Sequence, residues 1–280
     1  MHIVVCIKQV PDSAQIRVHP VTNTIMRQGV PAIVNPYDLF SLEAALRLKD
    51  SHGGRVTVIS MGPPQAEIAL KKCIAYGADE AILVTDRAFA GADTLATSFA
   101  LAQAIRQIEK DMKVDMVFAG KQTIDGDTAQ VGPGIAKRLN LQLLTYVAQI
   151  DAIDLEKNTI QVQRRAESGV QVLQTRLPCL ITMLEGSNDM RYATMENMFR
   201  AARYATKIWN KDAAGIEDVN KIGLKGSPTL VSKVFAPKPL ARRADIIDTE
   251  SNDPRDIALT LINKLFTQHP KMHDSLRSHS

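Results

Sequence analysis

Residues 114–134 read Val114-Asp-Met-Val-Phe-Ala-Gly-Lys-Gln-Thr-Ile-Asp-Gly-Asp-Thr-Ala-Gln-Val-Gly-Pro-Gly134. The run 114–119 predicts a buried strand and 135–139 predicts a helix, with a turn rich in glycine and hydroxyl groups between them. Such a turn holds phosphates in α/β proteins, because N–H groups at a helix start point outward and the helix dipole favours an anion. The turn contains neither G-x-x-x-x-G-K-[ST] nor G-x-G-x-x-G. It therefore indicates a nucleotide site without the mechanism of either motif, and a purely structural turn is the alternative.

The start of the following helix is open to two interpretations. Asp127 or Thr128 could cap it and leave the N–H groups around 129–131 free for a phosphate. Pro133 either kinks a helix that begins at Thr128 or is the first residue of a helix that begins later. Asp125 and Asp127 would repel a phosphate unless they bind ribose hydroxyls, a metal ion or a backbone donor.

Strand and helix patterns alternate along the first 150 residues. We predict strands at 3–7, 56–60, 81–85, 114–119 and 142–150, and helices at 36–49, 66–76 and 94–109. A short hairpin is predicted at 15–19 and 24–27. The alternation predicts an α/β fold with a doubly wound, mostly parallel, Rossmann-like sheet and helices on both faces. Ligands of such sheets bind beyond the carboxyl ends of the strands, where loops 6–11, 60–64, 85–93 and 120–134 lie.

The pattern changes after residue 150. Residues 159–165 and 170–175 alternate polar and apolar side chains around a turn, which predicts an antiparallel hairpin. We predict another buried strand at 178–182, and a helix at 253–266 with Asp253 as its cap and Pro254 as its first residue. We divide the chain into an α/β domain at 1–205 and an extended carboxyl-terminal arm at 206–280.

Composition excludes several classes of function. The chain has 280 residues, 45% hydrophobic and 23% charged, and its net charge of +4 is scattered. Aromatic residues make up only 5%, which argues against a platform for nucleic acid. Cys6, Cys73 and Cys179 form no C-x-x-C pair, and no H-x-x-x-H pair predicts a metal site. We expect no membrane span and no secretory signal, and hence a cytoplasmic protein with reduced thiols.

Three further segments are candidates for ligand contact. Asn35-Pro-Tyr-Asp38 is a helix start in which Asn35 is a cap or a ligand contact. Met61-Gly-Pro63 is a plain turn or a place where a ligand approaches the backbone. Gly91-Ala-Asp-Thr94 opens a helix with Asp93 or Thr94 as cap. No catalytic constellation is visible, which favours a protein that holds a cofactor over one that performs acid–base chemistry.

At two stretches the chain resembles the β subunit of electron-transfer flavoproteins. They are Val4-Val-Cys-Ile-Lys-Gln-Val-Pro11 and Val162-Gln-Arg-Arg-Ala-Glu-Ser-Gly-Val-Gln-Val-Leu-Gln-Thr-Arg-Leu-Pro-Cys-Leu-Ile-Thr182, and the resemblance covers nearly all of the chain. It implies an adenine-nucleotide-binding fold in which the ordinary branch of the family holds AMP. Asp125-Gly-Asp-Thr-Ala-Gln-Val-Gly-Pro133 and Asp86-Arg-Ala-Phe-Ala-Gly-Ala-Asp-Thr94 instead resemble the electron-bifurcating branch, whose site holds a second FAD.

The resemblance also implies site residues. Cofactor contacts are expected at Cys6, Asn35, Pro36, Tyr37, Asp38, Met61, Gly91, Ala92, Asp93, Thr94, Gly120, Lys121, Gln122, Thr123, Ile124, Asp125, Gly126, Asp127, Thr128, Ala129, Gln130 and Val131, with pyrophosphate at the last four. A loop near 184–205 is similar to the family's docking loop for flavin dehydrogenases, and Arg191, Tyr192, Met195 and Met198 are its candidate contacts. Met195 stands where the family usually has Leu. Methionines at helical spacing are otherwise typical of a core.

The activity that the resemblance implies is electron bifurcation. NADH would supply a hydride to the FAD of this chain. One electron would pass to ferredoxin or flavodoxin, and the other through the FAD of an α subunit to a flavin dehydrogenase such as an acyl-CoA dehydrogenase. The arm at 206–280 would pack on the α subunit. Two alternatives are a non-bifurcating carrier with AMP in the same pocket and a stand-alone ATP-binding regulatory or hydrolase domain.

Overall fold

The computed structural model describes residues 1–12, 17–18, 25–26, 31–230 and 253–270. The chain forms two compact units, Met1–Phe235 and Ala236–Ser280. The described part of the second unit contains helix α6 (Pro254–Gln268), which Asp253 caps through the N–H of Arg255, as the sequence predicts. The predicted boundary at residue 206 falls inside the first unit, because the chain adds one more strand to the sheet after it.

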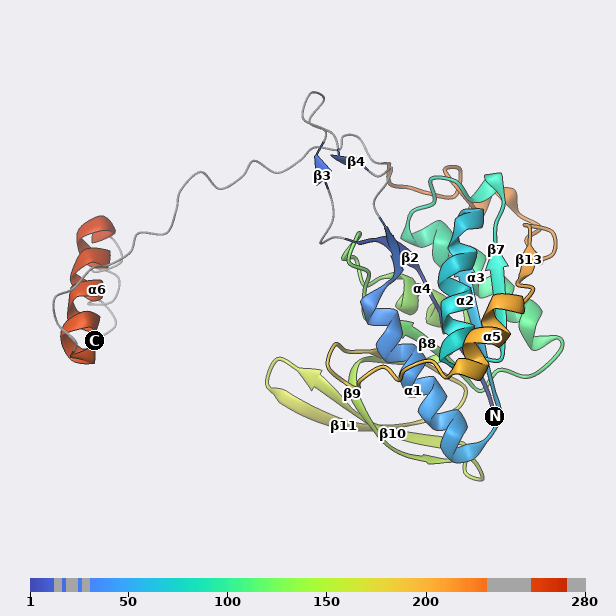
Figure 1. The fold of residues 1–280 in the computed structure, drawn as a ribbon, viewed down its shortest axis with the longest axis horizontal. Helices are drawn as coiled ribbons and strands as arrows, with labels where there is room; N and C mark the ends of the chain where they lie inside the picture. Colours follow the sequence, from blue (N-terminus) through green and yellow to red (C-terminus); the bar gives the residue numbers. More distant parts are fainter. Residues whose placement is uncertain (13–16, 19–24, 27–30, 231–252, 271–280) are drawn as a thin grey trace. The chain divides into compact units, whose positions relative to one another are not determined.

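A nine-stranded sheet is the centre of the first unit (Figure 1). Its spatial order is β11 (Gly169–Arg176), β10 (Thr159–Ala166), β9 (Gln142–Asp154), β12 (Cys179–Met183), β8 (Met116–Gly120), β1 (His2–Cys6), β6 (Arg55–Met61), β7 (Glu80–Val84) and β13 (Lys207–Trp209). Every pair from β9 to β13 is parallel, and β9, β10 and β11 pair antiparallel. The predicted doubly wound sheet with its antiparallel hairpin is therefore confirmed.

Helices cover both faces of the sheet. One core contains residues of α1 (Pro36–His52), α2 (Glu67–Tyr76) and α5 (Met195–Arg203), and α5 packs against α2. The other core contains residues of α3 (Thr94–Glu109) and α4 (Val131–Leu139), which pack against each other. Helices on both faces are what a parallel sheet needs, since its apolar side chains point to both sides.

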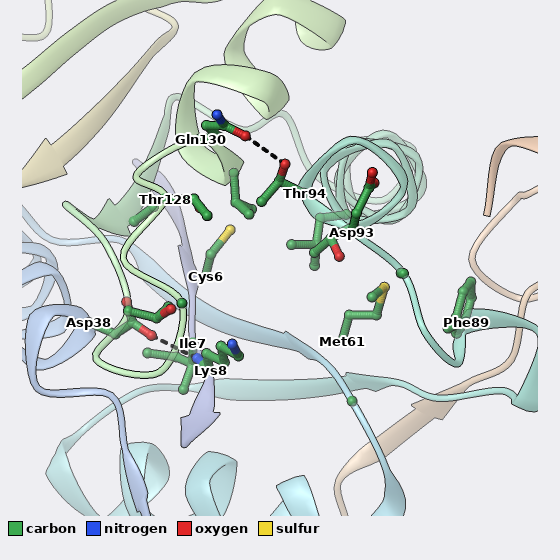
Figure 2. Close-up of a pocket in the computed structure, with 18 of the residues that line it drawn as sticks. Cys6, Ile7, Lys8, Asp38, Met61, Phe89, Asp93, Thr94, Thr128 and Gln130 are labelled. Atoms are coloured by element: carbon green, nitrogen blue, oxygen red, sulfur yellow. Dashed lines mark hydrogen bonds between the residues drawn. The ribbon is translucent and has the colours of Figure 1, made fainter. Parts of the chain in front are cut away.

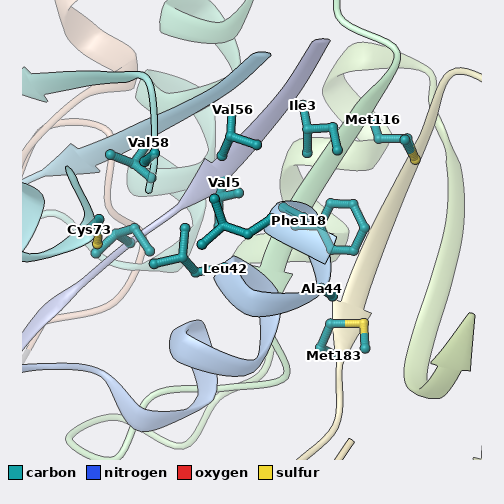
Figure 3. Close-up of a cluster of buried hydrophobic side chains, with 14 of the residues drawn as sticks. Ile3, Val5, Leu42, Ala44, Val56, Val58, Cys73, Met116, Phe118 and Met183 are labelled. Carbon is teal, nitrogen blue, oxygen red and sulfur yellow. The ribbon is translucent and has the colours of Figure 1, made fainter. Parts of the chain in front are cut away.

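The central strand shows how sequence produces these layers. Successive side chains of a strand point to opposite faces, so Ile3 and Val5 join one core while Val4 joins the other. All three are fully buried. Figure 3 shows Ile3 and Val5 with Phe118 of β8 and Leu42 of α1 in the first core. Burying a side chain of this size stabilises the fold by about 1.5–3 kcal/mol, so β1 and its neighbours form a stable base for the loops at their ends.

The order of the strands fixes where a ligand can bind. From β1 the chain adds β6 and then β7 on one side, and it then crosses to place β8 on the other side of β1. The loops after β1 and β8 therefore leave in opposite directions and open a crevice between them. Such a switch point is the usual ligand site of an open α/β sheet.

Several short elements differ from the predictions. The edge strand β13 was not predicted, because three residues give no periodic signal. A small sheet pairs β2 (Gln9–Pro11) with β5 (Ala32–Val34). The predicted hairpin is present as β3 (Arg17–Val18) paired with β4 (Ile25–Met26), and the rest of that prediction lies outside the described residues.

The start of α4 differs from both predicted alternatives. The helix begins at Val131, so Pro133 is its third residue and lies in the first turn. Proline is tolerated there because the N–H that it lacks would have no acceptor within the helix. Gln130 occupies the N-cap position and its side chain makes no capping hydrogen bond, so the prediction of Asp127 or Thr128 as cap was wrong.

Candidate functional site

A cavity of about 890 Å³ lies at the switch point, where the carboxyl ends of the central strands meet the starts of α3 and α4 (Figure 2). Cofactor sites in proteins span about 300–1,000 Å³, so the cavity is large enough for a nucleotide. The predicted site residues on its wall are Cys6, Asp38, Met61, Gly91, Ala92, Asp93, Thr94, Gly120, Lys121, Gln122, Thr123, Gly126, Thr128, Ala129, Gln130 and Val131. Loops that are far apart in sequence are thus brought to one site.

The remaining predicted residues are not part of this wall. They are Asn35, Pro36, Tyr37, Ile124, Asp125 and Asp127, which are absent from the cavity's lining. Asn35 shows what such a residue does. It is fully buried at the start of α1, and its side chain makes no capping hydrogen bond. Its Nδ2 donates to the Gln122 carbonyl (2.9 Å), and its Oδ1 accepts from the Ile124 N–H (3.3 Å). Asn35 therefore fixes the loop after β8 instead of capping a helix.

The backbone of this loop presents a row of unpaired donors. Within the described part of the chain, no acceptor takes the N–H groups of residues 128–132. Asp127 and Ala129 have φ angles of 51° and 55°, which are unusual for residues other than glycine. Alternation of left- and right-handed backbone turns successive N–H groups toward one side and creates an anion-binding concavity. Because these groups lie at the start of α4, the helix dipole adds to their attraction for an anion.

Asp38 connects the three elements that meet behind the cavity. Its Oδ2 accepts from the Lys8 N–H after β1 (2.7 Å), and its Oδ1 accepts from Asn35 Nδ2 (2.9 Å) and from the Gly120 N–H (3.2 Å). Burial raises the pKa of the Asp38 carboxyl to about 7, although these hydrogen bonds oppose the rise. A Cβ at Gly120 would lie 2.4 Å from Asp38 Oδ1, so only glycine permits this close approach.

Two lysines frame the same loop. Lys8 Nζ pairs with Asp125 at 2.7 Å and ties the loop to the end of β1. Burial alone would raise the pKa of Asp125, but Lys8 outweighs that effect and holds the pKa below its usual value. Lys121 Nζ lies 5.6 Å from the centroids of the Tyr37 and Tyr146 rings. Both lysines belong to the cavity wall, and Lys121 Nζ also pairs with Glu185 at 3.4 Å, so each positive charge is partly offset by a carboxylate.

The opposite wall is the segment between β7 and α3. Asp93 caps α3 by accepting from the N–H groups of Leu95 (2.9 Å) and Ala96 (3.0 Å), which confirms the cap interpretation. Asp93 also lines the cavity, so the two interpretations do not exclude each other. Thr94 Oγ1 donates to Gln130 Oε1 at 2.8 Å and joins this wall to the start of α4, as Figure 2 shows.

Sequence reasoning missed part of the lining. Ile7 and Lys8 lie in a loop that was predicted, but neither was selected within it. Phe89, Thr97 and Leu101 form an apolar end of the cavity together with the predicted Met61, and Figure 2 shows Met61 and Phe89 at the end away from Thr128 and Gln130. Thr97 and Leu101 follow Thr94 at helical spacing. That spacing was the available signal for a helix face turned to the site.

A second candidate surface lies at the start of α5. Tyr192 is 96% exposed and Met195 is 69% exposed, and Met198 and Phe199 are exposed beside them. Arg191 behaves differently, because its guanidinium pairs with Glu43 (2.9 Å) and Asp50 (2.8 Å) of α1. The structure thus separates the predicted docking residues into an anchor, Arg191, and an exposed apolar group.

The described residues contain no group of three or more His, Cys, Asp or Glu side chains that could hold a metal ion. Burial raises the pKa of the Cys6 thiol to about 12, so the one sulfur in the cavity wall besides Met61 is a neutral thiol. The cavity offers binding groups and no evident nucleophile.

In the described part of the chain, no helix is long and apolar enough to cross a membrane.

Comparison with known proteins gives a consistent result. Residues 22–214 match the family model of the electron transfer flavoprotein domain. Protein FixA of Azotobacter vinelandii is 67% identical over 276 residues, which cover 99% of this chain and 98% of that protein. Protein FixA of Azorhizobium caulinodans is 62% identical over 277 residues, with 99% and 98% covered. Electron transfer flavoprotein subunit beta of Clostridium acetobutylicum is 46% identical over 269 residues, with 96% and 99% covered.

Proposed function

The chain belongs to the electron-transfer flavoprotein family as a β-subunit-type member, and from this premise we propose that its cavity binds FAD and that the protein bifurcates electrons from NADH. The family also implies an α subunit as partner. The proposal concerns the nucleotide, the electron donor and the acceptors.

The observation that carries the proposal is the row of free N–H groups at 128–132. A pyrophosphate presents more acceptor oxygens than a single phosphate, and five successive donors suit the larger group. The cavity continues from these donors, past the start of α3, to the apolar side chains of Met61 and Phe89. An anion-binding end and an apolar end in one cavity fit any nucleotide with a phosphate and a flat aromatic ring, and the volume of about 890 Å³ favours the larger dinucleotide over AMP.

When bound, FAD supplies hydride acceptance and one-electron transfer, which protein side chains do not provide. The chain's own residues would bind and orient it. The N–H groups of 128–132 would hold the pyrophosphate, and Lys8 and Lys121 would offset its negative charge. Asp38, itself part of the cavity wall, would hold Gly120 close to α1. The neutral thiol of Cys6 would add polarisable surface without adding charge.

The partners follow from the same proposal. NADH is the electron donor, ferredoxin or flavodoxin is one acceptor, and the FAD of the α subunit leads to a flavin dehydrogenase such as an acyl-CoA dehydrogenase. Tyr192, Met195 and Met198 would dock that dehydrogenase, since exposed methionines adapt to a protein surface. Of the predicted arm at 206–280, the second unit, Ala236–Ser280, would pack on the α subunit.

Identification of the released nucleotides tests the proposal directly. The chain is purified with its α subunit and denatured, and the nucleotides are quantified. Two FAD per heterodimer support bifurcation. One FAD and one AMP contradict it and support the non-bifurcating carrier. ATP turnover by the chain alone would support the regulatory or hydrolase alternative.

A bulky side chain tests the position of the site. Thr128 is exposed on the cavity wall, so Thr128→Trp should expel the nucleotide while the fold stays intact. Ser168→Trp is the matched control, because Ser168 is an exposed residue of the β10–β11 turn, away from the cavity wall. Full nucleotide content in Thr128→Trp would show that the ligand binds elsewhere.

A further inference from the structure

Residues 223–229 form a segment that we call the latch. It follows the short helix η4 (Val219–Lys221) and Ile222, which is buried in the core beside α3. Lys221 Nζ lies 5.6 Å from the centroid of the Phe99 ring on α3. The latch is thereby anchored next to the helix whose first turn borders the cavity, but none of its own residues lines the cavity.

The latch holds Asp93 from two directions. Ser227 Oγ accepts from the Asp93 N–H (2.8 Å) and donates to the Gly223 carbonyl (2.7 Å). Thr229 donates to Asp93 Oδ2 from its Oγ1 (2.8 Å) and from its N–H (3.2 Å). Since Asp93 Oδ1 already caps α3, both of its carboxylate oxygens are engaged. Burial alone would raise the pKa of Asp93, but these hydrogen bonds outweigh it and keep the carboxylate charged.

The fit between the latch and the cavity wall is close. Gly91 has a φ of +73°, and a Cβ there would lie 2.6 Å from Leu224 Cδ2. Gly223 has a φ of +55°, and a Cβ there would lie 2.1 Å from the Ala88 carbonyl oxygen. The Leu224 side chain therefore packs directly on the Gly91 backbone, and the backbones of Gly223 and Ala88 approach each other, so both contacts need glycine.

A short chain of contacts leads from the latch to the phosphate-binding N–H groups. Thr229 binds Asp93, Asp93 adjoins Thr94, and Thr94 donates to Gln130 at 2.8 Å. Gln130 is the N-cap residue of α4, and its N–H belongs to the free row at 128–132.

We propose that Ser227 and Thr229 are positioning residues for the nucleotide. By fixing Asp93 they hold Thr94 against Gln130, and so keep the N–H row of α4 in its binding geometry. The nucleotide affinity then depends on two side chains that do not touch the nucleotide. Coupling of this kind is reciprocal, so a bound nucleotide also stabilises the latch. This inference rests on the proposed nucleotide site.

The test uses the complete chain in complex with its α subunit, after removal of bound nucleotides. FAD and AMP are titrated separately, and amide hydrogen exchange at 128–132 reports occupancy of this site alone. The double variant Ser227→Ala/Thr229→Val should bind about tenfold more weakly than the wild type, as expected for the loss of side-chain hydrogen bonds. Lys225→Ala, an exposed change within the latch, should bind as the wild type does. The single variant Thr229→Ser keeps the hydroxyl that donates to Asp93 and should bind as the wild type does.

A second measurement needs no variant. Because Thr229 N–H donates to Asp93, saturating nucleotide should slow its exchange in the wild type. A latch that only stabilises the fold would show exchange at Thr229 that does not depend on nucleotide, and this result would overturn the inference. Equal affinities for wild type and double variant would also overturn it while leaving the proposed function intact. If neither FAD nor AMP protects 128–132 in the wild type, the proposed site itself is wrong.

Discussion

The loop at 120–131 and the segment at 188–199 are both fastened to α1, but they expose opposite kinds of surface. Asn35 and Asp38 at the start of α1 hold the first part of the loop, and the backbone N–H groups at its end, from residue 128 onward, remain free. One turn further along, Glu43 holds Arg191, and the residues that follow expose Tyr192 and apolar side chains. In both regions a buried polar side chain of α1 fixes one end of a connecting segment. The other end keeps groups without a partner: backbone N–H groups in the first region and apolar side chains in the second.

The difference shows which class of partner suits each region. Free N–H groups around a helix start attract a small anion, because donors and dipole act together. Exposed apolar side chains on a short helix suit contact with another protein, because that contact would remove their apolar surface from water. One helix thus supports the proposed ligand site at its start and the proposed docking surface near its middle.

The largest expected effect comes from breaking the first region. In Gly120→Ala the new Cβ would lie 2.4 Å from Asp38 Oδ1 and 2.8 Å from the Tyr37 backbone. We expect the free energy of unfolding to fall by about 3 kcal/mol, the upper part of the usual range for overpacking, and nucleotide to be lost. Gly126→Ala in the same loop is the control, since its nearest contact would be Thr123 Oγ1 at 3.3 Å. Urea unfolding measures the free energy of unfolding of both variants. An equal loss of stability in Gly120→Ala and Gly126→Ala would refute the packing argument.

Loosening the segment at 188–199 should not affect the loop at 120–131. Glu43 is buried and accepts from Arg47 Nε (2.8 Å) and from the Arg191 N–H (3.2 Å) in addition to its ion pair. Glu43→Gln should cost about 2 kcal/mol of stability, because hydrogen bonds to a charged group are lost. Amide exchange at Arg191 should become faster while nucleotide content stays unchanged. Glu196→Gln on the exposed side of α5 is the control, and loss of nucleotide in Glu43→Gln would contradict the separation of the two regions.

The pH dependence sharpens the role of Asp38. Since its pKa is raised from 3.8 to about 7 in the folded protein, the folded state keeps a proton that the unfolded state releases in this window. The resulting stabilisation is complete below pH 3.8 and is lost as the pH rises through 7, by at most about 1.4 kcal/mol per pH unit. Comparison of wild type with Asp38→Asn by urea unfolding from pH 5 to pH 8 should show this slope only in the wild type. A difference that does not vary with pH would exclude it.

The smallest effect concerns the ion pair between Lys8 and Asp125. Both side chains are partly exposed, at 46% and 31%, so Lys8→Met should cost less than about 1 kcal/mol of stability. Nucleotide affinity should nevertheless fall several-fold and lose part of its salt dependence, because a positive charge leaves the cavity wall. Lys157→Met breaks an exposed pair with Asp154 and should leave binding unchanged. Equal binding of FAD by both variants would show that Lys8 has no part in the site.

Patterns of local origin were predicted well. The helix at Thr94–Glu109 begins and ends where the sequence places it, and the antiparallel hairpin and the capped helix α6 are confirmed. These elements depend on side-chain periodicity and on caps within a few residues. The loops around the cavity were also located correctly, since parallel strands carry their carboxyl ends to one edge of the sheet.

Predictions that depended on partners distant in sequence were less successful. Asn35 is at the start of a helix, yet its side chain caps no backbone N–H there and binds residues 122 and 124 as well as the Asp38 side chain. Gln130 occupies the N-cap position that was predicted for Asp127 or Thr128, and its side chain accepts a hydrogen bond from Thr94 on another helix. The contacts of Asp93 with Ser227 and Thr229 had no sequence signal at all, since no local pattern connects residues that far apart.

The sequence by itself determined the alternation of strands and helices, the class of the sheet and the glycine-rich turn at the carboxyl end of one strand. The hydrophobic period and the residue types of turns are local features, so they can be recognised in a single sequence. Only the tertiary structure decided which polar groups are used up by neighbours and which remain free for a ligand. That outcome depends on crossings of the chain at the switch point, where a buried Asn and a buried Asp satisfy one set of backbone donors and leave the next set open.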